Sequence, residues 1–304
     1  MINNKKIIIT GGGKGIGKAL ANYLVQDNLL EIIVLDKVIG DGLDKRVKAI
    51  ECDLTFKEID PEIEKYFSSA DYIFHLACIK PSDRGTTRNE FLDNIKMTEN
   101  VAMFNKKAKV IYSSAGTIYG SCNNFPISED CTIRCSENDY YCMGKLESES
   151  CLKEFSIKNS WDLVILRITN VYGQEFKRKG EILPNFFNSI RNNIPIKVYG
   201  DGSQKRDRIL IDDLVNAFRL CLDNGVVGTF NIGSGKSYST LKVAKMIGKI
   251  LKKKYEIIFL DSLDNERSDN LLDISEAKYV LGFYPKIKFK KGLKTVLEYW
   301  LKNE

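Results

Sequence analysis

The chain has 304 residues, of which 43% are hydrophobic and 28% charged, and its net charge is +6 at pH 7. This length suits one large α/β unit with a sizeable core. Its apolar runs stay below the roughly 18 residues that span a bilayer, and a strand expected from residue 5 leaves no room for a signal peptide. Lysines are spread along the chain and form no single basic face. We therefore expect a cytoplasmic protein that binds neither membrane nor nucleic acid.

Cysteine usage supports the same compartment. The eight cysteines include no Cys-x-x-Cys pair, and the only histidine, His75, is far in sequence from the closest two, Cys131 and Cys135. This spacing is not typical of a zinc site. We expect free thiols in a reducing environment, and no metal.

In chain order, short β-rich runs alternate with amphipathic segments of helical length. We expect strands at 5–10, 31–36, 47–52, 71–76, 108–113 and 162–167, and helices at 15–27, 58–69, 88–106 and 140–158. This alternation predicts an α/β fold with a Rossmann-like doubly wound parallel sheet.

After residue 170 the pattern changes to shorter segments punctuated by Pro and Gly, which predicts a smaller mixed α/β lobe over the carboxyl edge of the sheet. We assign residues 1–170 with about 208–236 to the Rossmann-like domain. The smaller, substrate-binding lobe then comprises about 171–207 with 237–304.

The most informative segment is the glycine-rich run 10–17, Thr-Gly-Gly-Gly-Lys-Gly-Ile-Gly, which follows the first predicted strand and opens a helix. Glycines let the backbone approach a dinucleotide pyrophosphate, and the helix N-terminus attracts its negative charge. Asp36 ends the second predicted strand about 20 residues later, where a carboxylate binds the adenosine ribose. The candidate residues in the glycine run are Gly11, Lys14, Gly15, Ile16 and Gly17.

A second pattern is Tyr141-Cys-Met-Gly-Lys145, which places a phenol and an ammonium on one face of a helix. A nearby lysine charge favours the phenolate, and a phenolate can remove a proton from a substrate hydroxyl. The same spacing recurs at 238/242 and 284/288, but only the first copy follows a strand that ends in hydroxyl residues, Ser113 and Ser114. We therefore predict that Tyr141 and Lys145 are catalytic.

With these blocks in place, the chain resembles the extended short-chain dehydrogenases/reductases of the NAD-dependent epimerase/dehydratase family, which act mostly on nucleotide-activated sugars. The resemblance runs nearly end to end and includes the blocks 52–54, 74–77, 113–120, 166–173, 199–207, 211–213, 230–235 and 272–277. It implies that Asp53 and Leu54 flank the adenine and that Leu76 and Ala77 line the nicotinamide side. It also implies that Asn170 and Arg206 reach the substrate's sugar or diphosphate, for which the planar fork of arginine is suited.

The glycine run departs from the family, since position 14 is lysine and the middle glycine stands at Gly15. That spacing resembles short-chain reductases in which a basic residue accompanies NADP. Asp36 argues for NAD, because its carboxylate would repel a 2′-phosphate. We expect NAD, with NADP as the less favoured alternative.

The catalytic hydroxyl also departs from the family, because Ala115 stands where relatives place Ser or Thr. Thr117 or Ser114 must then supply the hydroxyl, and we favour Thr117. No carboxylate follows in this segment, which argues against sugar dehydration and decarboxylation. The family's C-terminal arginine block is also missing, and Arg267 is either its replacement or a surface residue.

The sequence therefore predicts an NAD-dependent epimerase of a nucleotide-diphosphate sugar, acting through a transient keto sugar at C4. The close alternative is a nucleotide-sugar 4-ketoreductase or dehydrogenase with net redox. A non-catalytic binding protein on this fold is a third reading, against which the intact Tyr141–Lys145 pair argues. From the family we also expect a homodimer, formed through the helices near 88–106 and 140–158.

Overall fold

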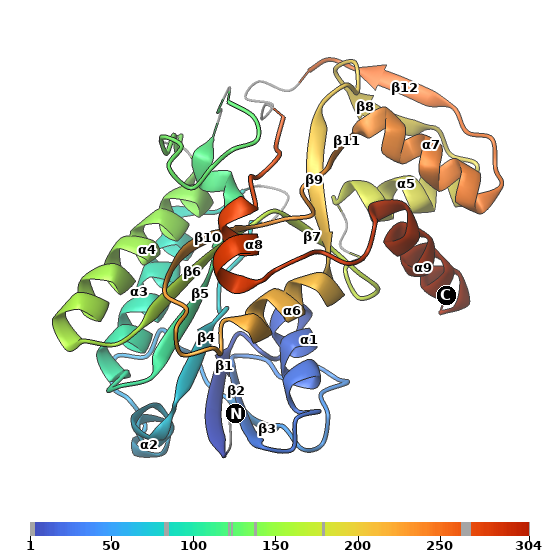
Figure 1. The fold of residues 1–304 in the computed structure, drawn as a ribbon. Helices are drawn as coiled ribbons and strands as arrows, with labels where there is room; N and C mark the ends of the chain where they lie inside the picture. The colour runs from blue at the N-terminus through green and yellow to red at the C-terminus, as the bar shows by residue number, and fades with distance from the viewer. Residues whose placement is uncertain are drawn as a thin grey trace.

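The computed structural model describes residues 4–81, 85–120, 122, 124–136, 139–177, 180–262 and 269–303. Within these residues, seven parallel strands form a central sheet that is covered by helices on both faces (Figure 1). The strands of this sheet are β1 (Lys5–Thr10), β2 (Leu30–Asp36), β3 (Lys48–Glu51), β4 (Tyr72–His75), β5 (Lys109–Ala115), β6 (Leu163–Ile168) and β10 (Gly228–Ile232). The strands and helices predicted for the first 170 residues are all present, with ends shifted by at most a few residues.

The order of the strands, β10-β6-β5-β4-β1-β2-β3, defines where a ligand can enter. The chain runs outward from β1 through β2 and β3, then returns to the opposite side of β1 as β4. The loops that follow β1 and β4 therefore diverge and leave a crevice at the carboxyl edge of the sheet, which is where doubly wound folds bind their ligands. The predicted fold class is confirmed.

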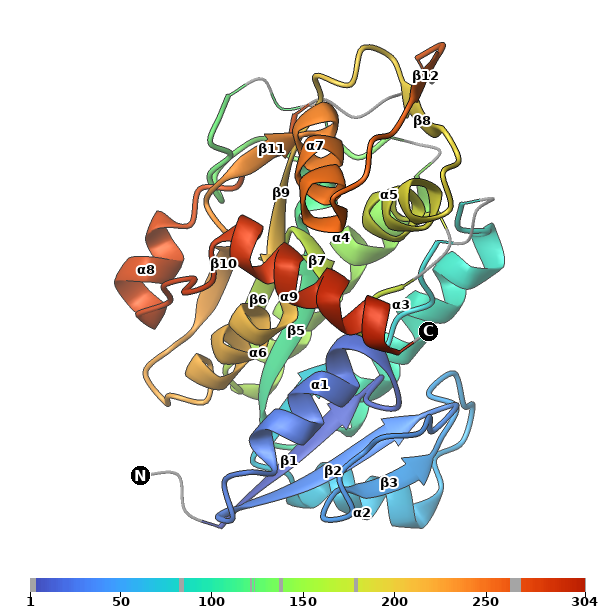
Figure 2. The ribbon, with the colours of Figure 1, turned by 90° about the vertical axis from the view of Figure 1, so that its right-hand side faces the viewer.

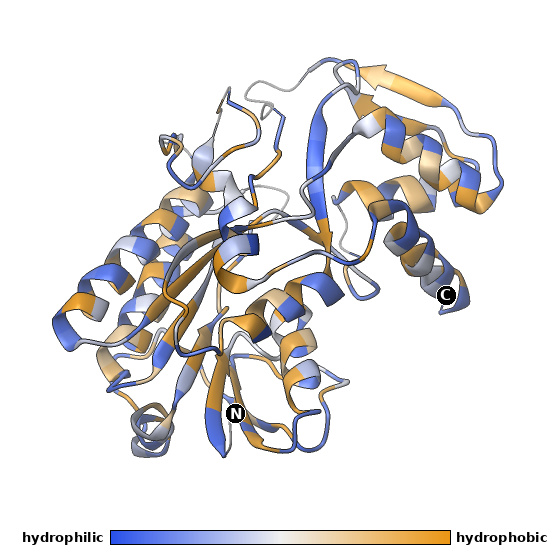
Figure 3. Cartoon of the chain, in the orientation of Figure 1, coloured by the Kyte–Doolittle hydropathy of each residue, from blue (hydrophilic) through white to orange (hydrophobic). Residues whose placement is uncertain are grey.

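Two apolar layers enclose the sheet. One face is covered by α1 (Gly15–Leu24), α6 (Ile211–Leu220) and α8 (Ser275–Leu281), and the other by α2 (Pro61–Ser69), α3 (Arg88–Phe104) and α4 (Tyr140–Asn159). Alternate residues of β1 enter opposite layers: Ile7 and Ile9 lie in the first and Ile8 in the second. Strands buried on both faces are apolar throughout, and the central sheet is accordingly largely orange in Figure 3.

The smaller lobe has its own core, in which the rings of Phe187 and Trp300 lie 5.3 Å apart. Its elements are β7 (Asn170–Tyr172), α5 (Ile182–Arg191), β8 (Ile196–Tyr199), β9 (Lys205–Leu210), β11 (Ser237–Ser239), α7 (Thr240–Leu251), β12 (Ile257–Leu260) and α9 (Phe289–Lys302). In Figure 2, β8, β11, β12, α5 and α7 lie above the central sheet, whereas α9 lies lower, at the level of its strands. Part of the segment 237–304 lies elsewhere, because Ala277 and Leu281 of α8 join the core of the sheet.

Strand β9 connects the two parts. The Thr169 hydroxyl, just after β6, donates to the Asp207 carbonyl at 3.0 Å, and the Ser234 hydroxyl, just after β10, donates to the Asp207 carboxylate at 2.5 Å. These two bonds join β9 to the carboxyl ends of β6 and β10 in the large sheet.

Candidate active site

The glycine-rich turn lies at the switch point between β1 and β4. A Cβ on Gly11 would lie 2.5 Å from the backbone nitrogen of Ala77, and one on Gly17 would lie 2.2 Å from the carbonyl oxygen of Gly11. Close backbone packing therefore requires these two glycines. Gly15 differs: it has a φ of +58° and no atom within 4 Å of its Cβ position. This open space at the first turn of α1 suits a dinucleotide pyrophosphate.

Asp36 is tied to this turn, as its carboxylate accepts a hydrogen bond from the Gly13 backbone N–H at 2.9 Å. Lys14 is exposed at the surface, while Ile16 packs against the core. A carboxylate held beside the turn suits the free 2′-hydroxyl of NAD and would repel the 2′-phosphate of NADP.

Asp53 and Leu54 follow β3 and have different surroundings. The Asp53 carboxylate accepts hydrogen bonds from Lys37 at 2.7 Å and from Thr55. The bond from Lys37 contributes most, and together these bonds lower the pKa of Asp53 to about 2. Leu54 is buried between the sheet and α3, and its carbonyl accepts a hydrogen bond from Asn100. Their expected position beside the adenine remains a prediction.

His75, at the end of β4, is fully buried. Its Nδ1 lies 2.8 Å from the Thr10 hydroxyl and its Nε2 lies 3.0 Å from the Thr98 hydroxyl. Burial, and secondarily the charge of Lys145, lowers its pKa to about 3. The imidazole is therefore neutral near pH 7, and hydroxyl groups hold both of its nitrogens, as expected for a structural residue.

Tyr141 and Lys145 occupy the first two turns of α4. The Lys145 ammonium donates to the Ser113 carbonyl at 2.7 Å and lies 5.9 Å from the centre of the Tyr141 ring. Burial acts to lower the Lys145 pKa, but the thiol of Cys78 and the phenols of Tyr112 and Tyr141 outweigh it, so that the pKa is raised. Lys145 therefore stays charged at neutral pH, and its charge favours the phenolate of Tyr141.

A small cavity of about 10 Å³ lies beside this pair. It is lined by Ala77, Cys78, Asn94, Thr98, Tyr112, Tyr141, Gly144, Lys145 and Ser148. Ala77 and Leu76 were both expected on the nicotinamide side, and Ala77 lines this cavity. Leu76, which precedes it, donates its backbone N–H to the Thr10 carbonyl at 3.1 Å. The cavity thus joins the end of β4 to the catalytic face of α4.

The lining residues Thr98, Tyr112 and Ser148 were not anticipated from the sequence. The Thr98 hydroxyl lies 2.9 Å from that of Ser148, and the Lys145 ammonium lies 5.0 Å from the centre of the Tyr112 ring. Ser148 could have been predicted from the sequence, because a residue two helical turns after Tyr141 lies on the same face of the helix. Thr98 lies on another helix, and no local pattern pointed to it.

The two candidate hydroxyls have opposite surroundings. The Ser114 hydroxyl donates to the buried carboxylate of Glu149 at 2.5 Å, and Arg167 also donates to that carboxylate, at 2.8 and 3.1 Å. The Thr117 hydroxyl, in η1 (Gly116–Tyr119), is buried and has no hydrogen-bond partner among the described residues. An unsatisfied buried hydroxyl is costly, whereas the Ser114 hydroxyl is already engaged, so Thr117 stays the favoured candidate for the catalytic hydroxyl.

The expected substrate residues lie on the strands that join the lobes. Asn170, in β7, is exposed and donates to the Asp207 carbonyl at 3.1 Å. Arg206, in β9, is partly exposed and donates to the Lys205 carbonyl at 3.2 Å. Arg267 lies outside the described residues.

The expectation of eight free thiols is wrong for two cysteines. Cys135 and Cys142 form a disulfide with Cα atoms 5.8 Å apart, whereas the other six cysteines are free. The segment before α4 runs back beside η1, where the Arg134 backbone N–H donates to the Ile118 carbonyl. This return brings Cys135 to the first turn of α4, which sequence spacing alone does not show.

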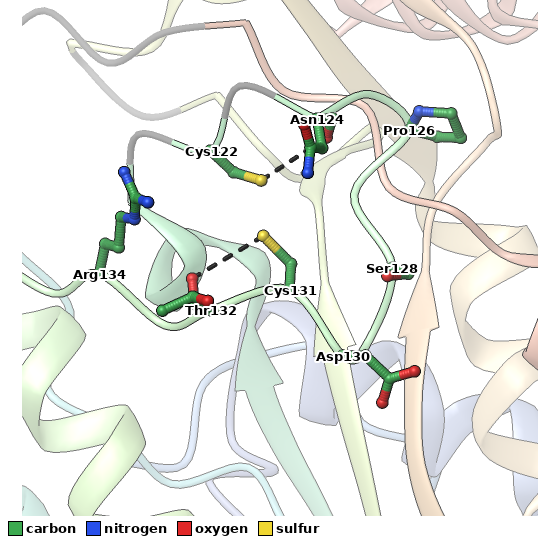
Figure 4. A pocket seen from close by; sticks show the side chains of 8 residues that line it. All are labelled: Cys122, Asn124, Pro126, Ser128, Asp130, Cys131, Thr132 and Arg134. Carbon is green, nitrogen blue, oxygen red and sulfur yellow. Dashed lines mark hydrogen bonds between the residues drawn. The ribbon is translucent and has the colours of Figure 1, made fainter.

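A larger cavity, of about 450 Å³, lies within the same loop. Its lining residues are Cys122, Asn124, Pro126, Ser128, Asp130, Cys131, Thr132 and Arg134, and Figure 4 shows the sulfur atoms of Cys122 and Cys131 pointing toward each other. It shares no lining residue with the cavity at Tyr141. The two cavities are therefore separate, and only the smaller one is lined by Tyr141 and Lys145.

The described residues offer neither a metal site nor a membrane span. No group of three or more His, Cys, Asp or Glu side chains there is arranged to hold a metal ion. Likewise, none of the described helices combines the length and apolar character needed to cross a membrane.

The sheet topology, the glycine turn and the Tyr–Lys pair define a nicotinamide-dependent enzyme of the short-chain dehydrogenase/reductase class. Residues 7–233 match the model of the NAD dependent epimerase/dehydratase family. The chain belongs to this family, and its cofactor is NAD. The glycine turn and Asp36 fit that cofactor, as described above.

Similar proteins cover nearly the whole chain. A putative UDP-glucose 4-epimerase of Methanocaldococcus jannaschii is 28% identical over 98% of both chains, and a dTDP-4-dehydro-6-deoxyglucose reductase of Escherichia coli is 30% identical over 96% of both. Among solved structures, a UDP-N-acetylglucosamine 4-epimerase from Methanobrevibacter ruminantium, in complex with UDP-N-acetylmuramic acid, has a TM-score of 0.90 at 25% identity. It covers 99% of this chain and 100% of its own. A UDP-glucuronic acid 4-epimerase from Bacillus cereus, in complex with UDP-glucuronic acid and NAD, has a TM-score of 0.86 at 25% identity. It covers 98% of this chain and 100% of its own.

Proposed function

We propose that the chain is an epimerase of a nucleotide-activated sugar that acts at C4 through a transient keto sugar. The observation that carries this proposal is the Tyr141–Lys145 pair on the catalytic face of α4, with the unsatisfied Thr117 hydroxyl in the adjoining segment. The 4-epimerases among the similar proteins support the proposed reaction.

Each residue has one task in this reaction. Tyr141, as phenolate, removes the proton from the C4 hydroxyl and later returns it. Lys145 keeps its charge near the phenol and thereby lowers the cost of that phenolate. Thr117 binds the same hydroxyl and fixes its orientation. NAD, when bound at the glycine turn and Asp36, would supply a reversible hydride acceptor for C4, so that the hydride could return to the opposite face of the keto sugar.

The surroundings of Thr117 argue against dehydration of the sugar. Its neighbours Ala115 and Gly116 carry no carboxylate, and the nearby Glu149 is buried and held by Arg167 and Ser114. A carboxylate bound in this way cannot serve as the acid or base that removal of water needs.

A 4-ketoreductase with net redox is the second candidate. The reductase of Escherichia coli, at 30% identity, is the observation in its favour. It would use the same tyrosine and lysine, but it must exchange its cofactor in every turnover, whereas an epimerase retains NAD.

The first test is therefore the nucleotide released by acid from the purified protein. We expect near-stoichiometric NAD or NADH after gel filtration, and C4 epimers from at least one of UDP-glucose, UDP-N-acetylglucosamine and UDP-glucuronate. An empty protein that binds NADPH best and consumes it with a 4-keto sugar would establish the reductase instead.

The Tyr141→Phe variant tests the mechanism. Loss of the proton acceptor should lower kcat by about 10²- to 10⁴-fold, with NAD still bound. Tyr284→Phe is the matched control, because Tyr284 belongs to another Tyr-x-x-x-Lys pair and is 60% exposed. Equal activity of the two variants would show that Tyr141 is not the base.

A further inference from the structure

The larger cavity, of about 450 Å³, is lined by two thiols that the proposed reaction does not use. Cys122 is 5% exposed and Cys131 is partly exposed, and both are free. Their sulfur atoms point toward each other (Figure 4). A cysteine that serves only as an apolar core residue is close-packed on all sides, whereas these two thiols face a cavity and one another.

The contacts of the two thiols with neighbouring backbone are weak. The Cys122 Sγ lies 3.6 Å from the Asn124 carbonyl oxygen, and the Cys131 Sγ lies 3.8 Å from the Thr132 carbonyl oxygen. Burial, and then the interaction with Cys122, raises the pKa of Cys131 to about 11. The two thiols therefore act on each other directly, as a dithiol and not as two independent cysteines.

The pair lies beside the disulfide that this loop already contains. Cys122 and Cys142 belong to one small apolar cluster, against which Cys131 and Cys135 pack. A bonded and an unbonded pair of sulfurs thus share one cluster. The bond between Cys135 and Cys142 means that thiols of this cluster are oxidised in the folded protein.

We propose that Cys122 and Cys131 are a modification site that reacts with a low-molecular-weight disulfide and forms a second, reversible disulfide. One thiolate of the pair attacks a sulfur of the small disulfide, so that a mixed disulfide forms and one small thiolate leaves. The second protein sulfur then attacks the first, and the other small thiolate leaves. The two protons of the protein thiols pass to the two small thiolates. The protein pair is oxidised and the small disulfide is reduced.

The second step is intramolecular, because the two sulfurs already face each other. A thiol held in this way has a high effective concentration toward its neighbour, so the mixed disulfide should not accumulate. The new bond would join Cys122, which follows η1, to the segment that leads to α4. The inference does not depend on the proposed substrate, since no residue of the pair belongs to the catalytic group.

The test maps disulfides before and after treatment with bis(hydroxyethyl) disulfide at mildly alkaline pH. The untreated wild type should contain the Cys135–Cys142 bond and six free thiols. After treatment, peptide mapping by mass spectrometry should find Cys122 linked to Cys131, with no reagent attached to either. Dithiothreitol should restore both thiols. Phenylarsine oxide, which bridges two adjacent thiols, should prevent the new bond when it is added first.

Variants distinguish a pair from two separately reactive cysteines. Cys122→Ser should form no second disulfide and should keep the reagent as a mixed disulfide at Cys131, because no neighbouring sulfur displaces it. Cys131→Ser gives the same comparison if Cys122→Ser does not fold. Cys151→Ser, the matched control, removes a free and partly exposed cysteine of α4 and should form the new bond as the wild type does.

Three results for the treated wild type would overturn the proposal. In the first, both thiols stay free. In the second, a stable mixed disulfide persists at Cys122 or Cys131. In the third, Cys131 becomes linked to Cys135 or Cys142, which would mean exchange with the existing disulfide.

Discussion

At the scale of single residues, the two hydroxyls near Tyr141 differ in what they bind. Ser114 donates to Glu149, whereas the buried hydroxyl of Thr117 lacks a partner among the described residues. A hydroxyl that has no hydrogen-bond partner in the free protein can form one with the substrate in the transition state. Preorganised donors of this kind contribute to rate more than to folding.

We predict that Thr117→Val lowers kcat by about 10- to 100-fold, because the lost hydrogen bond goes to the substrate, and leaves the free energy of unfolding equal or higher, because the hydroxyl is unsatisfied in the free protein. Ser114→Ala should instead keep most of kcat and lose about 1–3 kcal/mol of the free energy of unfolding, as the Glu149 carboxylate loses a donor. Steady-state kinetics and urea unfolding measure both. The reverse pattern would make Ser114 the catalytic hydroxyl.

His75 predicts a pH dependence of stability. Its pKa falls from 6.5 to about 3 on folding, so between these values the unfolded chain binds a proton that the folded protein does not. The free energy of unfolding should therefore rise with pH in this window, by about 1.4 kcal/mol per pH unit from this residue. His75→Gln should lack that slope between about pH 4 and pH 6 and match the wild-type slope above about pH 7.5. Parallel curves for the two proteins would contradict the assignment.

At the scale of elements, α4 is attached at several points. Asp139 accepts a hydrogen bond from the Cys142 backbone N–H at 3.0 Å, and Cys142 is bonded to Cys135. Further along the helix, Glu149 binds β5 through Ser114 and β6 through Arg167. These contacts hold the helix that carries Tyr141 and Lys145 in a defined register against the sheet.

The disulfide makes a simple prediction. Thiol titration of the denatured protein should find six groups before reduction and eight after it. Because the bond closes a short loop, reduction should lower the free energy of unfolding by roughly 2–3 kcal/mol. Cys135→Ser should show no such response, and Cys151→Ser, which alters a free cysteine of α4, should respond like the wild type. Eight thiols without reductant would contradict the pairing.

At the scale of the whole molecule, α3 and α4 pack together and carry exposed apolar side chains. Leu92 and Met103 of α3 are 45% and 53% exposed, and Ile157 of α4 is 83% exposed. Apolar groups on two adjacent helices suit the self-complementary contact of a twofold dimer.

We predict that the protein elutes as a dimer, with twice its mass of 34.6 kDa. Ile157→Glu should shift it toward the monomer in light scattering, because it places a charge in the contact. Tyr279→Glu is the control, since Tyr279 is 89% exposed on α8 instead. A monomeric wild type, or a dimer insensitive to Ile157→Glu, would contradict this interface.

Much of the fold could be predicted because its signals are local. The strand of Ile7–Ile9 was predicted from three consecutive apolar residues before a glycine turn, and the structure places it inside the sheet, between β4 and β2. Tyr141 and Lys145 were predicted from a spacing of four, which any helix turns into a shared face. The same spacing could not show that Tyr112 and Thr98 line the cavity beside them, because β5 and α3 bring these residues in from elsewhere in the chain.

The sequence by itself determined the glycine turn, the carboxylate at Asp36 and the Tyr141–Lys145 face, since backbone conformation and helical periodicity depend on residues close in the chain. Only the tertiary structure decided that Ser114 binds Glu149 and that Cys135 reaches Cys142. The hydrogen-bond and ion-pair partner of a buried polar group is chosen by the packing of strands and helices against one another. Ser114 and Arg167, for example, both bind Glu149, and they lie 35 and 18 residues away from it in the sequence.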